Sequence, residues 1–211
     1  MDPGGSVRQN ALGHYPSMMS RSRLLIVLIA SGLALLGCSA DTGSGDGGGG
    51  DEANVVIGPA DEGIDGVVAV SVPKNTHTDG VVDYELQPPA GGAHNSVWLN
   101  CGFYDEPKQD ENVVHALEHG AVWLAYSPDL SPADIDVIHD LARANPKVVA
   151  TPYPDLAADV AVVATAWSRQ LTLDSVDDPR LEAFSVQYTD GSQAPEAGVT
   201  CAGSPLGMPI P

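Results

Sequence analysis

The stretch Glu111-Asn-Val-Val-His115-Ala-Leu-Glu118-His119-Gly120 runs directly into Ala121-Val-Trp-Leu-Ala-Tyr126. The second half is an apolar run of strand length, which predicts a buried β-strand. The first half predicts a short helix, in which His115 and His119 lie four positions apart on one face and Glu118 lies beside them. The sequence therefore predicts a chelating group of side chains that is fixed against a sheet.

Helical and extended segments alternate around this stretch. A helix begins at Ser131-Pro132 and another at Asp178-Pro179, because each pair offers an N-cap followed by proline at the first helical position. Extended segments are expected at residues 67–72, 147–150 and 160–167. The pattern predicts an α+β fold, a small mixed β-sheet with two or three helices packed on it. A thioredoxin-like strand order fits this pattern, although the sequence has no Cys-x-x-Cys motif.

The first 37 residues are predicted to be a leader with a lipoprotein signal peptide. The basic segment Ser20-Arg21-Ser22-Arg23 precedes the apolar residues 24–36, a run too short for a comfortable membrane span. The following Leu35-Leu36-Gly37-Cys38 resembles the bacterial lipobox, in which the cysteine is acylated and becomes the mature N-terminus. Cys38 is therefore the predicted lipidation site, and ordinary secretion or an uncleaved anchor are the alternatives. Met18 or Met19 can be the true start.

Residues 38–54 predict a lipid-anchored, Gly-rich tether, and residues 55–211 predict a single globular domain. The net charge of −19 at pH 7 repels nucleic acid and anionic surfaces and attracts cations. The expected partners are the membrane, through the N-terminal lipid, and a metal ion, whereas no protein partner is indicated. We expect a bacterial cell-envelope location facing the periplasm or the exterior. Ser39 after the lipidated cysteine favours the outer membrane if the source is Gram-negative.

Two cysteines remain once Cys38 is assigned to lipidation. In an oxidising compartment, the pair Cys101 and Cys201 predicts a disulfide. It closes a loop of roughly 100 residues, for which the chain-entropy model gives about 4.7 kcal/mol of stabilisation. It would hold residues 191–211 on the domain. The alternative makes Cys101 a metal ligand near His94.

Four histidines lie in the loop-rich half of the domain. We predict that His94, His115 and His119 bind a transition metal, Cu or Zn, and that His77 or Glu118 completes the site. The domain would then sequester or deliver the metal, or be stabilised by it. The alternative is a non-enzymatic envelope interaction module whose histidines are structural and bond to loop carbonyls.

The H-x-x-E-H spacing also resembles the inverted zinc-peptidase motif, in which both histidines bind zinc and the glutamate is the general base. Glu118 would then be the catalytic residue of a small metal-dependent hydrolase. Those peptidases need a third acidic ligand far downstream and a large two-lobed chamber, and the chain behind the motif is short. The sequence therefore favours binding over enzymatic activity.

Several further motifs follow one another in a recognisable order. They are Pro88-Pro89-x-x-Gly92-x-His94, Trp98, Cys101-Gly-Phe-Tyr104, Val114-His115-x-Leu-Glu118-His119-Gly120-x-Val122, Pro152-Tyr153-Pro154 and Thr165-Ala-Trp167. Over roughly residues 67–201 the chain resembles the bacterial domain-of-unknown-function family 3105, whose members are often secreted or membrane-anchored. Gly91 and Ser168 replace a Ser and a Gly that are common in that family. The resemblance implies domain boundaries and a functional role for the His94, His115, Glu118 and His119 group, but no activity.

Overall fold

The structure is a computed structural model that describes residues 57–60, 63–73 and 75–211. The predicted leader, Cys38 and the tether lie outside these residues. The strands are β1 (Ile57–Pro59), β2 (Val68–Val70), β3 (Gly102–Phe103), β4 (Val122–Tyr126), β5 (Val148–Pro152), β6 (Val162–Ala166) and β7 (Arg169–Leu173). The helices are α1 (Asp110–Glu118), α2 (Pro132–Ala144) and α3 (Pro179–Tyr188).

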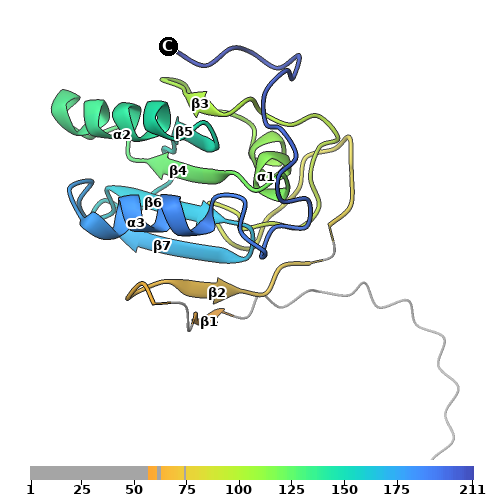
Figure 1. Cartoon of the computed structure of the whole chain (residues 1–211), viewed down its shortest axis with the longest axis horizontal. Coiled ribbons are helices and arrows are strands. Elements are labelled where there is room, and N and C mark those ends of the chain that lie inside the picture. The colour runs from red at the N-terminus through yellow and green to blue at the C-terminus, as the bar shows by residue number, and fades with distance from the viewer. Residues whose placement is uncertain (1–56, 61–62, 74) are drawn as a thin grey trace, which may run out of the picture. The chain divides into compact units, whose positions relative to one another are not determined.

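The described strands form one mixed sheet in the order β1-β2-β7-β6-β4-β5-β3 (Figure 1). This confirms the predicted α+β fold with a mixed sheet and packed helices. In its centre β4 pairs parallel with β5 and antiparallel with β6, and β6 pairs antiparallel with β7. Helix α2 makes the crossover that two successive parallel strands require. The resulting β7-β6-β4-β5 arrangement is the thioredoxin-like strand order.

Strand β7 was missed by the sequence analysis, which passed from residues 160–167 to the last helix. In the structure β6 and β7 form a hairpin, because Ala166 pairs with Arg169 and only Trp167 and Ser168 lie between them. Ser168 has a φ of 56°, in the left-handed region that Gly or Asn usually occupies in such turns. The turn therefore had no recognisable signal in the sequence. Strands β1 and β3 were also missed, since each has no more than three residues.

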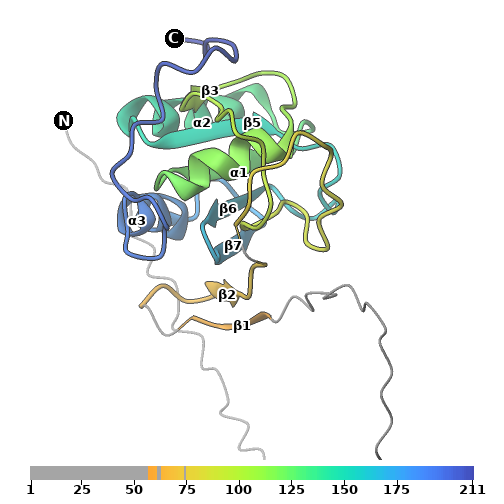
Figure 2. The same ribbon diagram turned by 90° about the vertical axis from the view of Figure 1, so that its right-hand side faces the viewer.

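Alternate residues of β4 point into two separate cores on opposite faces of the sheet. Leu124 belongs to the core beneath α2 and α3, together with Ile138 and Phe184. Trp123 belongs to the other core, with Leu117 of α1 and with side chains from the surrounding loops. Figure 1 shows α2 and α3 over one face of the sheet, and Figure 2 shows α1 with the loops around it. We call these two sides the helix face and the loop face.

Helix α1 is joined to β4 through Gly120, which has a φ of 91°. A Cβ atom at this position would lie 2.6 Å from Asp190 Oδ1, so a side chain is excluded both by the backbone conformation and by space. Gly120 thus ends the helix and leads directly into β4. The N-cap of α1 is Gln109, which makes no side-chain capping bond.

The chain after α3 crosses the loop face with little regular structure. A disulfide joins Cys101 to Cys201, which confirms the predicted pairing and excludes a role for Cys101 as a metal ligand. The Asn100 side-chain amide donates to the carbonyls of Ser204, Leu206 and Gly207. These bonds fix the C-terminal tail beside α1 and β3.

The disulfide indicates an oxidising, extracytoplasmic environment. None of the helices in the described part of the chain has the length and apolar character that a membrane span requires.

Candidate metal centre

Three segments of the chain meet at the C-terminal end of α1. The helix supplies His115 and Glu118, which are about 95% buried, and His119 forms its C-cap. A loop after the Pro-Pro turn supplies His94, which is completely buried. An upstream loop supplies His77, whose side chain is 56% exposed. Ligand atoms of His77, His94, His115 and Glu118 all lie within 4.8 Å of one another.

The backbone around His94 holds this residue against the helix. Gly91 has a φ of 139°, and a Cβ atom there would lie 3.1 Å from the Trp167 ring. His94 also pairs through its backbone with the His77 loop, since its N–H donates to Thr76 O and its carbonyl accepts from Thr78 N. The loop that carries His77 and the loop that carries His94 are thereby joined to each other through their backbones.

Three of the histidines share one hydrogen-bonding arrangement, in which ring atom Nδ1 faces a backbone carbonyl. Because a carbonyl oxygen can only accept, each Nδ1 carries the hydrogen and each neutral ring has its lone pair on Nε2. Metal-binding histidines are typically oriented in this way, with the second ring nitrogen bonded to an acceptor. The acceptors are Gly92 O for His94 (2.8 Å), Asn95 O for His115 (2.7 Å) and Thr200 O for His119 (2.9 Å).

The Nε2 lone pairs are directed at other acceptors. His94 Nε2 lies 2.9 Å from Glu118 Oε2, and His115 Nε2 lies 3.0 Å from His119 Nε2. Two such acceptors repel each other unless a proton or a cation lies between them. Ligand atoms of a tetrahedral zinc ion, each 2.0–2.1 Å from the metal, are about 3.3 Å apart. The arrangement therefore suits a cation.

Burial lowers the pKa of His115 and of His119 below the ordinary value of an imidazole. In each case the hydrogen bond to a backbone carbonyl acts in the opposite direction but is the smaller effect. The neutral rings, which are the forms that bind metals, are thus favoured at pH 7.

Glu118 is held in place by a residue that the sequence analysis did not select. Asn75 Nδ2 donates to Glu118 Oε1 at 2.5 Å, which leaves Oε2 directed at His94. His77 Nε2 lies 3.9 Å from the same Oε2 atom. One carboxylate oxygen therefore faces both an exposed and a buried imidazole.

Aromatic rings surround the cluster. The Trp98 ring centroid is 5.8 Å from that of His115 and 5.3 Å from that of His119. Trp167 packs edge-on to His94 at 6.1 Å. These rings cover part of the cluster with apolar surface.

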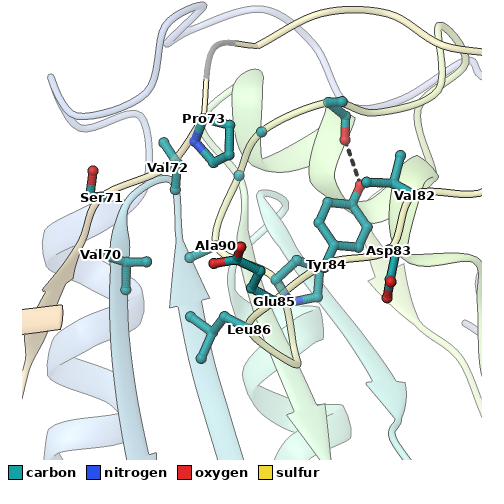
Figure 3. Close-up of a pocket in the computed structure, with 14 residues that line it drawn as sticks. Val70, Ser71, Val72, Pro73, Val82, Asp83, Tyr84, Glu85, Leu86 and Ala90 are labelled. Atoms are coloured by element: carbon teal, nitrogen blue, oxygen red, sulfur yellow. Dashed lines mark hydrogen bonds between the residues drawn. The ribbon is translucent and has the colours of Figure 1, made fainter. Parts of the chain in front are cut away.

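A pocket of about 340 Å³ adjoins the His94 loop and is lined by residues 89–93, among others (Figure 3). Tyr84, which also lines it, donates a hydrogen bond from its hydroxyl group to Ala93 O at 2.7 Å, drawn as a dashed line in Figure 3. None of the clustered histidines lines this pocket. It shares a wall with the cluster but is a separate feature.

The sequence analysis selected His94, His115 and His119, with His77 and Glu118 as further candidates. The structure brings all of these except His119 into the four-residue group. His119 instead lies at the edge of the group, where it contacts His115.

Glu196 was not selected from the sequence. Its Oε2 atom lies 3.6 Å from His119 Nε2, and its backbone N–H donates to Glu118 O. It is the only acidic residue between Gly191 and Pro211. The sequence did hold a signal for Glu196, because the zinc peptidases that share the H-x-x-E-H motif need an acidic ligand far downstream.

Together, the fold and the cluster define an extracytoplasmic α+β domain with a buried histidine–glutamate centre. The chain belongs to the family described as protein of unknown function (DUF3105), whose model matches residues 75–203, more than half of its length. The match includes the whole cluster and both disulfide cysteines. No curated protein and no solved structure matches the chain.

Proposed function

We propose that this domain binds a divalent transition-metal ion, Zn(II) or Cu(II), through His77, His94, His115 and Glu118. The observation that carries the proposal is the short distance between ring nitrogens and acceptors that face one another across the cluster. The Nδ1 bonds to carbonyls place the lone pairs of His94 and His115 on Nε2, where each faces another acceptor within 3.0 Å. A bound cation that accepts these lone pairs removes the repulsion.

The choice of metal follows from the ligand types. Imidazole and carboxylate groups suit Zn(II) and Cu(II), whereas Cu(I) prefers thiolate and thioether ligands. The described cysteines are joined in a disulfide, and the described methionine, Met208, is 84% exposed. The four-residue group therefore offers nitrogen and oxygen but no sulfur.

The exposure of His77 favours exchange of the metal over permanent retention. Three of the four ligands are buried, whereas the His77 side chain is 56% exposed. Structural zinc sites are usually closed by four buried protein ligands. A site with one exposed ligand can take up and release its ion from one side, which suits sequestration or delivery of a metal in the cell envelope.

The domain is proposed to work at a membrane, to which a lipid on Cys38 attaches it. The lipobox-like Leu35-Leu36-Gly37-Cys38 and the Gly-rich tether support this proposal. Cys38→Ala should release the protein from the membrane fraction, and mass spectrometry should find acyl chains on the N-terminal peptide of the wild type. An unmodified Cys38 in the membrane-bound wild type would contradict it.

The test of metal binding uses the full chain, purified in detergent, stripped with a chelator and reloaded with Zn(II) or Cu(II). Wild type should retain metal at or above one ion per chain after desalting, and His94→Ala should retain one ion fewer than wild type. His139→Ala is the matched control, because His139 bonds to Pro211 O and is outside the cluster. Circular dichroism establishes that each variant is folded.

A folded wild-type chain that retains neither metal at near-stoichiometric level would overturn the proposal. The remaining interpretation would then be an envelope interaction module in which the histidines are structural.

A further inference from the structure

His119 and Glu196 lie next to the four-residue group but are not part of it. His119 Nε2 is 3.0 Å from His115 Nε2 and 3.6 Å from Glu196 Oε2. Both distances are close to the separation of about 3.3 Å between ligands of one tetrahedral ion. His119 Nε2 thus has an imidazole on one side and a carboxylate on the other, and the three side chains offer a second set of donor atoms.

The two sets have the same chemical composition. His77, His94 and Glu118 supply two imidazoles and one carboxylate. His115, His119 and Glu196 do the same. Each set therefore matches the nitrogen and oxygen ligands that Zn(II) and Cu(II) prefer. Three protein ligands also leave a coordination position open for water.

His115 lies between the two sets of ligands, and the number of ions bound depends on which set its ring nitrogen joins. Its Nδ1 donates to Asn95 O, so its single remaining lone pair is on Nε2. That lone pair can serve one ion. It faces His119 Nε2 at 3.0 Å, which places it with the second set, and the first set still keeps three ligands without it.

We propose that the cluster holds two metal ions, one bound by His77, His94 and Glu118 and the other by His115, His119 and Glu196. This inference rests on the proposed metal-binding function and extends it to a two-metal centre. A single ion would use His115 with the first set, whereas a second ion recruits His115, His119 and the tail.

The C-terminal tail supplies or orients ligands of the second proposed metal ion. Thr200 O orients the His119 ring, and the adjacent Cys201 is fixed by its disulfide to Cys101. Glu196 comes from the same tail, and its N–H donates to Glu118 O at 2.9 Å. The second position therefore depends on residues that follow α3, about 80 residues after α1.

Charge and access are compatible with a second cation. The Glu196 side chain is 52% exposed, so an ion can reach it from solvent. The nearby Lys147 ammonium donates to His119 O, but it is paired with Asp190 at 2.7 Å. Each proposed ion has its own carboxylate, which lowers the repulsion between the two.

The test is the metal stoichiometry of the full chain, purified in detergent, stripped and then titrated with Zn(II) and separately with Cu(II). Wild type should bind two ions per chain. Glu196→Gln and His119→Ala should each bind one. Glu182→Gln, at an exposed position on α3, is the matched control and should bind two. In the doubly loaded Cu(II) form, electron paramagnetic resonance should show broadening and a half-field signal from two neighbouring ions, and Glu196→Gln should show neither.

A wild-type stoichiometry of one, unchanged in Glu196→Gln and His119→Ala, would overturn this inference and leave the proposed function intact. Two ions in both variants would also overturn it, because the second ion would then be bound elsewhere. A stoichiometry of zero in folded wild type would overturn the proposed function and this inference together.

Discussion

The two faces of the sheet are built in different ways. The helix face is an apolar core in which residues of α2 and α3 pack on alternate strand positions. The loop face has one short helix, α1, and buries His94, His115, Glu118 and His119 among loops and the C-terminal tail. The first face follows from hydrophobic periodicity. The loop face depends on backbone carbonyls, glycines and a disulfide. These features hold polar side chains at buried positions, where hydrophobic periodicity would predict apolar side chains.

Phe184→Ala should have the largest effect on stability and should leave metal binding unchanged. Phe184 is completely buried on the helix face, and such a truncation costs about 3–5 kcal/mol because it leaves a cavity. Urea unfolding measures the loss. Val186→Ala on the same helix is the control, since Val186 is 71% exposed and its truncation should change stability by less than about 0.5 kcal/mol. A loss of metal in folded Phe184→Ala would show that the two faces are not independent.

Replacing Cys101 and Cys201 together by Ser should lower stability by about 2–4 kcal/mol. It should also weaken metal binding, because Thr200, which orients His119, is adjacent to Cys201. Urea unfolding and metal titration of the same preparation measure the two effects. An unchanged metal affinity at clearly reduced stability would mean that hydrogen bonds alone hold the tail in place.

Metal addition should stabilise the folded chain through the loop face. At a free metal concentration of 100 times Kd, binding to the native state alone adds about 2.7 kcal/mol to the free energy of unfolding. His94→Ala should gain clearly less than wild type, because the ion that His94 binds is lost, whereas His139→Ala should gain as much as wild type. Thermal unfolding with and without Zn(II) measures this. Equal stabilisation of wild type and His94→Ala would locate the metal outside the cluster.

Asp110→Asn should have the smallest effect, visible only in the pH dependence of stability. Burial raises the pKa of Asp110 to about 6. A raised folded-state pKa stabilises the protein fully below the ordinary value near 4, and this contribution is lost as the pH rises through about 6. Because Asp110 is only partly buried, solvent screening limits the effect to about 1 kcal/mol. The Asn variant should therefore lose less stability than wild type between pH 4 and pH 7.

Urea midpoints at several pH values test this, with Asp136→Asn on the exposed side of α2 as the control. Wild type and Asp110→Asn with the same pH profile would contradict the role assigned to burial at this position.

Elements with a strong periodic or capping signal were predictable from the sequence. Strand β4 is an apolar run, and α2 and α3 each begin with a polar N-cap and a proline that the structure confirms. Strand β7 was not predictable, because its hairpin turn is Trp167-Ser168 and has neither Gly nor Asn. The disulfide followed from the number of cysteines and an oxidising compartment.

By itself the sequence determined the fold class, the disulfide pairing and the candidacy of the residues around H-x-x-E-H, because these depend on local patterns and residue counts. Only the tertiary structure decided which groups meet. The chain makes the deciding contacts across loops. Asn75 bonds to Glu118, and Glu196 lies beside His119. The histidine rings bond to the backbone carbonyls of Gly92, Asn95 and Thr200. A backbone carbonyl has no residue-type signature in a sequence. The orientation of each imidazole, and hence the chemistry of the centre, becomes defined only when the chain is folded.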